Sequence, residues 1–198
     1  MFVQVIQGST SDREGFRRQL DRWNEELRPG AIGFLGSTAG VAQDGAAIAV
    51  ARFESAEAAR QNSERPEQGR WWAETEKIFD GEVSFYDYEE VRLLHGGGSD
   101  DAGFVQIISG RATDKGRMDA LEDEILAWFP NVRPDFIGSL LAWDGDRFIE
   151  VAYFESEAAA RDGEARVAES DNAAQFQEWI DLCEDMTYVD IPEPRMTS

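Results

Sequence analysis

The sequence predicts an α+β fold in which a βαββαβ unit occurs twice. The first observation is a repeated strand, in which Phe2-Val3-Gln4-Val5-Ile6-Gln7-Gly8 returns as Phe104-Val105-Gln106-Ile107-Ile108-Ser109-Gly110. The second is a helical apolar pattern after each copy, and the third is a pair of strands joined by an Asp-Gly turn. We therefore expect two ferredoxin-like modules packed sheet to sheet as an intramolecular pseudo-dimeric α/β barrel.

The first module begins with a strand over residues 2–7. Ser11-x-x-Glu14 has the pattern of a helix-capping box. The apolar residues after it recur at helical spacing: Phe16, Leu20, Trp23 and Leu27. Pro29 ends this helix. Two strands are expected next, over residues 31–37 and 46–53, joined by a turn. Ser55 is expected to cap a second helix, and a further helical segment carries two tryptophans. The last strand is marked by alternating Val83, Phe85 and Asp87.

The second module repeats this order. Its helical stripe consists of Met118, Leu121, Ile125 and Trp128, and its two central strands are expected over residues 135–142 and 147–154. Arg28-Pro29 of the first module returns as Arg133-Pro134. A cation at the C-terminal end of a helix is stabilised by the helix dipole, which explains these arginines without a functional role.

Residues 95–101 are rich in glycine and charge and predict a flexible linker. The linker divides the chain into a module over residues 1–94 and a second over residues 102–198. His95, the only histidine, is expected to be solvent-exposed there. Phe2 and Ile6 point to one face of the first sheet and Val3 and Val5 to the other, so both faces are apolar. The tethered sister module is the nearest partner that could cover the face without helices. Further self-association of the whole chain is left open.

The composition excludes several classes of function. A net charge of −21 is incompatible with a phosphate-binding surface, so no nucleic acid is expected as a partner. Cys183 is the single cysteine, which excludes an intrachain disulfide and, with one histidine, a conventional metal site. The chain has no apolar run of membrane-spanning length, and its first residues form a strand rather than a signal peptide. We therefore expect a soluble, cytoplasmic protein that does not associate with membranes.

A family resemblance rests on the opening strands, on the Phe-Glu-Ser-x-x-Ala segments that begin at Phe53 and Phe154, and on residues 63–72. With these features the chain resembles a tandem member of the dimeric α/β-barrel superfamily, particularly the antibiotic-biosynthesis-monooxygenase-like (ABM) group. The resemblance implies a pocket between sheet and helices in each module. It also implies cofactor-independent oxygenation of aromatics, haem degradation, isomerisation, or binding alone. Haem degradation is disfavoured because that family supplies a histidine ligand, and we expect no cofactor.

Six residues are candidates for ligand contacts: Gln4, Asn62, Trp71, Trp72, Gln106 and Phe176. The two glutamines interrupt apolar strands, either as amides bonded across the pseudo-dyad at the sheet interface or as polar groups of a pocket. Adjacent helical residues point about 100° apart, so one indole is expected in the core and the other at a pocket, unless both only fill space. Asn62 resembles the asparagine that ABM oxygenases pair with tryptophan, although a surface or capping position accounts for it without a ligand. We expect unequal pockets, with ligand binding in the first module, where the indoles offer a stacking surface.

The sequence favours a small-molecule-binding or accessory protein for an apolar or aromatic ligand. The alternative is a cofactor-independent ABM-type monooxygenase acting on an apolar aromatic substrate. Among 40 acidic residues no pair can be singled out for acid–base chemistry, so the sequence assigns no catalytic residue and leaves open whether the protein is an enzyme.

Overall fold

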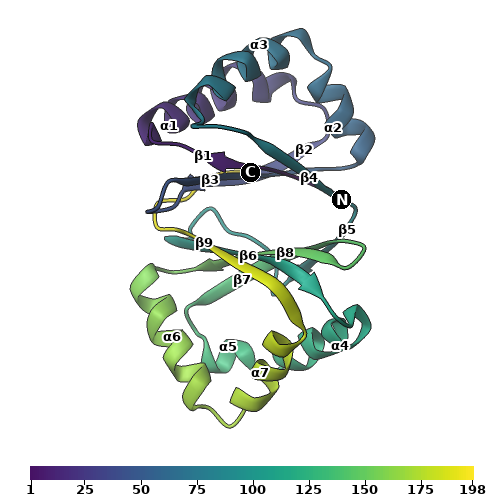
Figure 1. Ribbon diagram of the computed structural model, residues 1–198, viewed down its shortest axis with the longest axis vertical. Coiled ribbons are helices and arrows are strands. Elements are labelled where there is room, and N and C mark those ends of the chain that lie inside the picture. Colours follow the sequence, from purple (N-terminus) through teal and green to yellow (C-terminus); the bar gives the residue numbers. More distant parts are fainter. The chain divides into compact units, whose positions relative to one another are not determined.

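The computed structural model describes all 198 residues and divides into two compact units. The first comprises Met1–Val91 and Glu193–Ser198, and the second comprises Arg92–Pro192. Each unit is a five-stranded antiparallel sheet with helices on one face (Figure 1), so the prediction of two ferredoxin-like α+β modules is confirmed.

The first unit contains the helices α1 (Arg13–Arg22), α2 (Ala56–Ser63) and α3 (Pro66–Thr75), which lie over one face of its sheet (Figure 1). Its strands are β1 (Phe2–Ser9), β2 (Phe34–Val41), β3 (Ala46–Phe53), β4 (Ser84–Tyr88) and β10 (Arg195–Thr197), in the spatial order β10-β2-β3-β1-β4. The core beneath the helices is built from Phe16, Ala39, Ala47 and Phe79, around which Leu20 and Trp72 pack.

Two local predictions in the first unit need correction. The residue that caps α1 is Asp12 rather than Ser11, because the Asp12 carboxylate accepts a hydrogen bond from the Gly15 N–H at 2.7 Å. The second strand begins at Phe34 instead of residue 31, since a 3₁₀ turn at Arg28–Gly30 prolongs the connection after a π-helical turn at Trp23–Leu27. Ser55 caps α2 as predicted, accepting from the Ala58 N–H at 3.1 Å.

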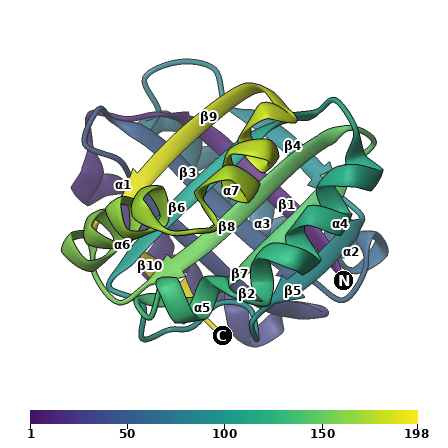
Figure 2. The same cartoon turned by 90° about the horizontal axis from the view of Figure 1, so that it is seen from below.

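The second unit contains α4 (Lys115–Leu126), α5 (Phe129–Val132), α6 (Glu157–Glu169) and α7 (Ala173–Asp181). Figure 2 shows these helices in front of its sheet. The strands are β5 (Glu90–Leu94), β6 (Phe104–Ala112), β7 (Phe136–Asp144), β8 (Arg147–Phe154) and β9 (Cys183–Ile191), in the spatial order β5-β7-β8-β6-β9. Ser156 caps α6 by accepting from the Ala159 N–H at 3.2 Å.

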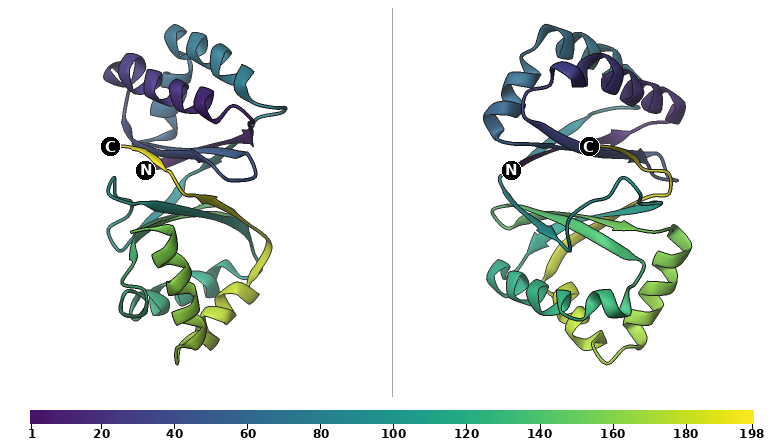
Figure 3. Two further views of the ribbon diagram at one scale, coloured as in Figure 1. Left: turned by 90° about the vertical axis from the view of Figure 1, so that its left-hand side faces the viewer. Right: turned by 180° about the vertical axis from the view of Figure 1, so that it is seen from behind.

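Each sheet takes one edge strand from the chain segment that follows the other module. Strand β5 comes directly after β4 of the first module, yet it pairs with β7 of the second, and Leu94 joins the second unit's core. Conversely, the C-terminal strand β10, yellow in Figure 3, pairs with β2 of the first unit. The unit boundaries therefore fall at Val91 and Pro192 rather than on either side of residues 95–101.

The expected flexible linker is packed against the second unit. A Cβ at Gly138 of β7 would lie 2.3 Å from the Gly97 carbonyl oxygen and 3.0 Å from that of His95, so this connection runs closely over the strand. His95 itself is exposed, as predicted. Across the whole chain no helix combines the length and the apolar character that a membrane span requires.

Candidate functional site

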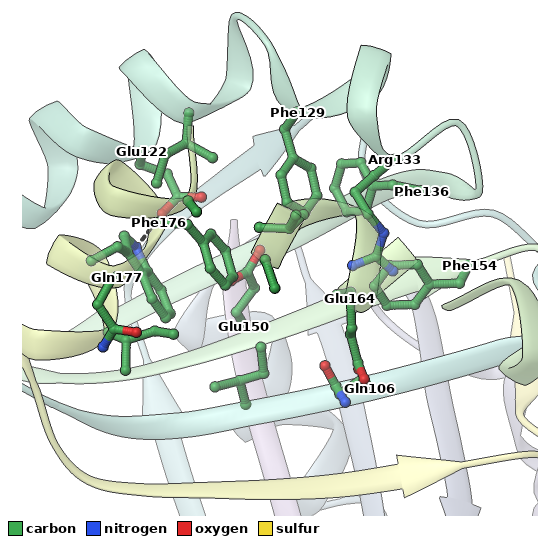
Figure 4. Close-up of a pocket in the computed structure, with 18 of the residues that line it drawn as sticks. Gln106, Glu122, Phe129, Arg133, Phe136, Glu150, Phe154, Glu164, Phe176 and Gln177 are labelled. Carbon is green, nitrogen blue, oxygen red and sulfur yellow. Dashed lines mark hydrogen bonds between the residues drawn. The ribbon is translucent and has the colours of Figure 1, made fainter. Parts of the chain in front are cut away.

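The second unit contains an open cavity of about 800 Å³ between its sheet and its helices (Figure 4). This volume lies in the range of small-molecule sites. Aromatic rings form much of its wall: Phe129, Phe136, Phe154, Phe176 and Trp179.

The aromatic wall is continuous. Phe176 of α7 stacks on Trp179 with ring centroids 6.2 Å apart, and on Phe129 of α5 at 6.1 Å. Phe129 in turn meets Phe136 of β7 edge to face at 5.1 Å. Rings held by neighbouring rings present fixed flat surfaces, which suit a flat apolar guest.

Two carboxyl groups interrupt this apolar surface. Glu122 projects from α4 and Glu150 from β8, and both are buried, with relative exposures of 6% and 8%. Figure 4 shows both beside Phe176. The Trp179 indole N–H donates to Glu122 Oε2 at 2.7 Å. Neither carboxyl has a cationic partner of its own, because Arg92, whose charge acts on Glu122, is already bound by two aspartates.

Burial changes the acidity of this carboxyl pair. Desolvation, followed by the charge of Glu150, raises the pKa of Glu122 to about 8. Desolvation also raises the pKa of Glu150, against the opposing effect of the Ser139 hydroxyl. Two like charges in an apolar cavity disfavour each other, so the pair retains a proton near neutral pH and can accept or donate one there.

The far end of the cavity is ionic but internally compensated. Arg133 is buried and donates from Nη2 to Asp135 Oδ2 at 2.8 Å and to the Ala160 carbonyl at 3.1 Å. Arg161 forms ion pairs with Asp190 of β9 and with Glu164. Arg133 thus forms a buried ion pair, in addition to lying at the end of a helix as the sequence predicted.

Two predicted residues, Gln106 and Phe176, line this large cavity. Gln4 lines a smaller cavity of about 110 Å³ in the first unit. Each glutamine donates from Nε2 to an aspartate on the neighbouring strand at 3.0 Å, Gln4 to Asp87 and Gln106 to Asp190. The alternative that placed them at a sheet interface with a partner across the pseudo-dyad is therefore wrong, because their partners lie in their own sheets.

The first module's tryptophans pack its interior. Trp71 is buried and its indole N–H donates to the Gln19 carbonyl at 2.9 Å. Trp72 packs edge to face on Phe85, with centroids 5.2 Å apart. Asn62 is buried and holds the chain ahead of β2, accepting from the Ile32 N–H at 3.0 Å and donating to the Ile32 carbonyl at 2.6 Å.

The cavities are unequal, as predicted, and the larger one lies in the second module. In the first module, where ligand binding was expected, Trp71 and its neighbours leave a cavity of only about 110 Å³. Trp71 and Asn62 do line the small cavity that remains, whereas Trp72 does not.

The sequence reasoning missed Glu122 and Glu150, although both break an apolar pattern. Glu122 lies at helical spacing with Met118 and Ile125, and Glu150 interrupts the apolar strand β8. The first module has apolar residues in their places. Ala49 pairs with Ile6 in the first sheet, just as Glu150 pairs with Ile108 in the second, so Ala49 and Glu150 correspond. Leu20 and Glu122 also correspond, because each follows the N-cap residue of its helix by the same number of residues. Comparing the two repeats position by position would have identified the pair.

No group of three or more histidine, cysteine, aspartate or glutamate side chains is arranged to hold a metal ion. The polar side chains that line the cavity are carboxyl groups, amides, arginines and the Tyr188 hydroxyl.

Comparison with known proteins establishes the fold. No family profile and no curated protein sequence matches this chain. Among solved structures, a candidate monooxygenase from Fusobacterium nucleatum superimposes with a TM-score of 0.75 at 9% identity, over 96% of this chain and 90% of that one. A candidate monooxygenase from Lactobacillus acidophilus gives 0.69 at 10% identity, over 100% and 99% of the two chains. An anthrone oxidase-like protein gives 0.69 at 13% identity, over 98% and 92%.

The chain shares the two-module fold of these three proteins over nearly its whole length. The resemblance drawn from the sequence is thereby confirmed at the level of architecture. At 9–13% identity these three likenesses concern the fold alone.

Proposed function

We propose that the protein binds a flat, apolar aromatic small molecule in the large cavity of its second module. The observation that carries this proposal is an 800 Å³ cavity walled by stacked aromatic rings. Its volume accommodates a guest of several fused rings. The few polar groups among those rings are of the kind that fixes a guest's orientation.

Titration with 9-anthracenemethanol, whose emission is separate from that of tryptophan, tests this proposal. We expect saturable binding to the whole protein, weakened about tenfold or more in Phe176→Ala, because that change removes a stacking partner worth roughly 1–3 kcal/mol. Trp72→Phe is the matched control in the first module and should leave the affinity unchanged. Loss of binding in Trp72→Phe with full binding in Phe176→Ala would contradict the proposal.

A second candidate function is cofactor-independent oxygenation of an aromatic substrate. The observation in its favour is the carboxyl pair, which can accept a proton near neutral pH beside the aromatic wall. One neighbour in fold is named an anthrone oxidase-like protein. Removing a proton from the anthrone methylene gives an electron-rich enolate, and the enolate reacts with dioxygen to give anthraquinone and water overall.

Oxygen uptake with anthrone tests this second function. The protein should accelerate uptake above the spontaneous rate, with one dioxygen consumed for each anthraquinone formed. Glu150→Gln keeps the shape of the side chain but removes the base, so the acceleration should disappear. An unchanged rate in this variant would exclude Glu150 as the base, and a wild-type rate equal to the spontaneous one would leave binding alone.

A further inference from the structure

The charges along the cavity are unevenly compensated. Of the two arginines that line it, Arg133 is bound by Asp135, and Arg161 is bound by Glu164 and Asp190. Glu122 and Glu150, at the other end, have no such partner. The aromatic end of the cavity therefore holds a carboxyl pair that retains a proton near neutral pH, and no cation of the protein compensates the negative charge that the pair bears when it ionises.

The same end has more hydrogen-bond acceptors than donors. One oxygen of Glu122 accepts from the Trp179 indole. For the second oxygen of Glu122 no N–H group of the protein serves as a donor, and beside Glu150 the only donor is the Ser139 hydroxyl. A buried carboxyl with so few donors is costly, and a guest that supplies N–H groups would relieve that cost.

The aromatic rings favour the same kind of guest. Phe176 and Trp179 stand next to the carboxyl pair and are stacked with their planes 11° apart. The faces of aromatic rings attract cations, most strongly where water is excluded. Carboxylates and ring faces together are complementary to an ammonium group attached to an aromatic skeleton.

We infer that the guest of this cavity carries a protonated amine, which Glu122 and Glu150 bind beside the rings of Phe176 and Trp179. This inference rests on the proposed function, since it names the chemical class of the same guest. A carboxylate on the guest would be disfavoured, because it supplies no N–H group and its charge opposes ionisation of the glutamates. The first module has Leu20 and Ala49 at the corresponding positions, so selectivity for an amine belongs to the second module alone.

Three probes that share one ring system test the inference on the whole protein: 9-anthracenemethylamine, 9-anthracenemethanol and 9-anthracenecarboxylate. They present a cation, a neutral donor and an anion to the same site. Fluorescence titration at neutral pH should rank them in that order, with the amine at least about tenfold tighter than the alcohol, the effect of a hydrogen bond to a charged group.

Two variants locate the selectivity. Glu150→Gln and Glu122→Gln should each reduce the preference for the amine over the alcohol to about threefold or less, while binding of the alcohol itself persists. Glu184→Gln, on the exposed surface of β9, removes the same charge outside the cavity and should retain the full preference. If a glutamine variant does not fold, the ranking of the three probes on the unaltered protein still decides.

The outcomes separate the inference from the function on which it rests. If none of the three probes binds, the proposed function fails. If the alcohol binds as tightly as the amine, or the carboxylate binds more tightly than either, the function stands and the inference is overturned. A preference for the amine that survives both glutamine variants also overturns it, because the charge would then come from elsewhere.

Discussion

Replacing Gly163 of α6 by alanine should destabilise the protein, although this substitution normally stabilises a helix. Replacing an interior glycine by alanine favours a helix by about 1 kcal/mol. At Gly163, however, the added Cβ would lie 1.9 Å from Nε of Arg133 and 2.6 Å from its Cζ. The guanidinium would have to move by about 1.5 Å to reach normal contact distance. That shift breaks its 2.8 Å bond to Asp135.

The size of the effect follows from burial of this pair, whose side chains are 5% and 3% exposed. Disrupting a buried ion pair costs about 3–5 kcal/mol, so Gly163→Ala should destabilise the protein by about 2–4 kcal/mol after the helix gain is subtracted. Differential scanning calorimetry should show Tm falling by about 5–10 °C.

Two controls isolate the clash. Gly69 lies inside α3, and a Cβ added there would have no atom within 4 Å, so Gly69→Ala should raise Tm. In an Arg133→Met background, Gly163→Ala should no longer destabilise. The reasoning is refuted if Gly163→Ala stabilises the unaltered protein as Gly69→Ala does.

Three further predictions concern other parts of the molecule. The pKa of Glu122 is raised to about 8 and that of Glu150 is also raised, so the folded protein binds more protons than the unfolded chain. The free energy of unfolding, measured by urea titration, should therefore fall as the pH rises from about 5 to about 8. The fall should be less steep in Glu150→Gln. Burial and the charges of Glu122 and Glu150 raise the pKa of Cys183 to about 12, so iodoacetamide should alkylate Cys183 far more slowly than a free thiol. Alkylation should be faster in Glu150→Gln than in the unaltered protein. Equal rates in these two proteins would refute the effect of Glu150 on the Cys183 thiol. Removing residues 193–198 deletes β10 and exposes the edge of β2. Tm should therefore fall, and size-exclusion chromatography should show self-association through the exposed edge. A monomer of unchanged Tm would show that this strand is dispensable.

Much of the fold was predictable because its signals are local. The strands expected over residues 46–53 and 147–154 coincide with β3 and β8, where apolar residues lie between turn signals. The exchanged edge strands were missed. Glu90–Leu94 and Arg195–Thr197 are short, and their pairing depends on partners distant in the sequence.

The site was harder to predict because the position of a cavity depends on the directions in which the surrounding side chains point. Two adjacent tryptophans indicated a stacking surface, but the Trp71 indole points toward the Gln19 carbonyl and occupies the space itself. No local pattern specifies that direction. The carboxyl pair was accessible in principle, since Glu150 stands where the first repeat has Ala49, but only a register-by-register comparison of the repeats reveals it.

The most direct test of the central claim is a crystal structure of the protein grown with 9-anthracenemethylamine. We expect the ring system between the helices and sheet of the second unit, against Phe176, with its ammonium nitrogen within hydrogen-bond distance of Glu150 or Glu122. Density for the probe beside Trp71 in the first unit, with the second cavity free of it, would contradict the account.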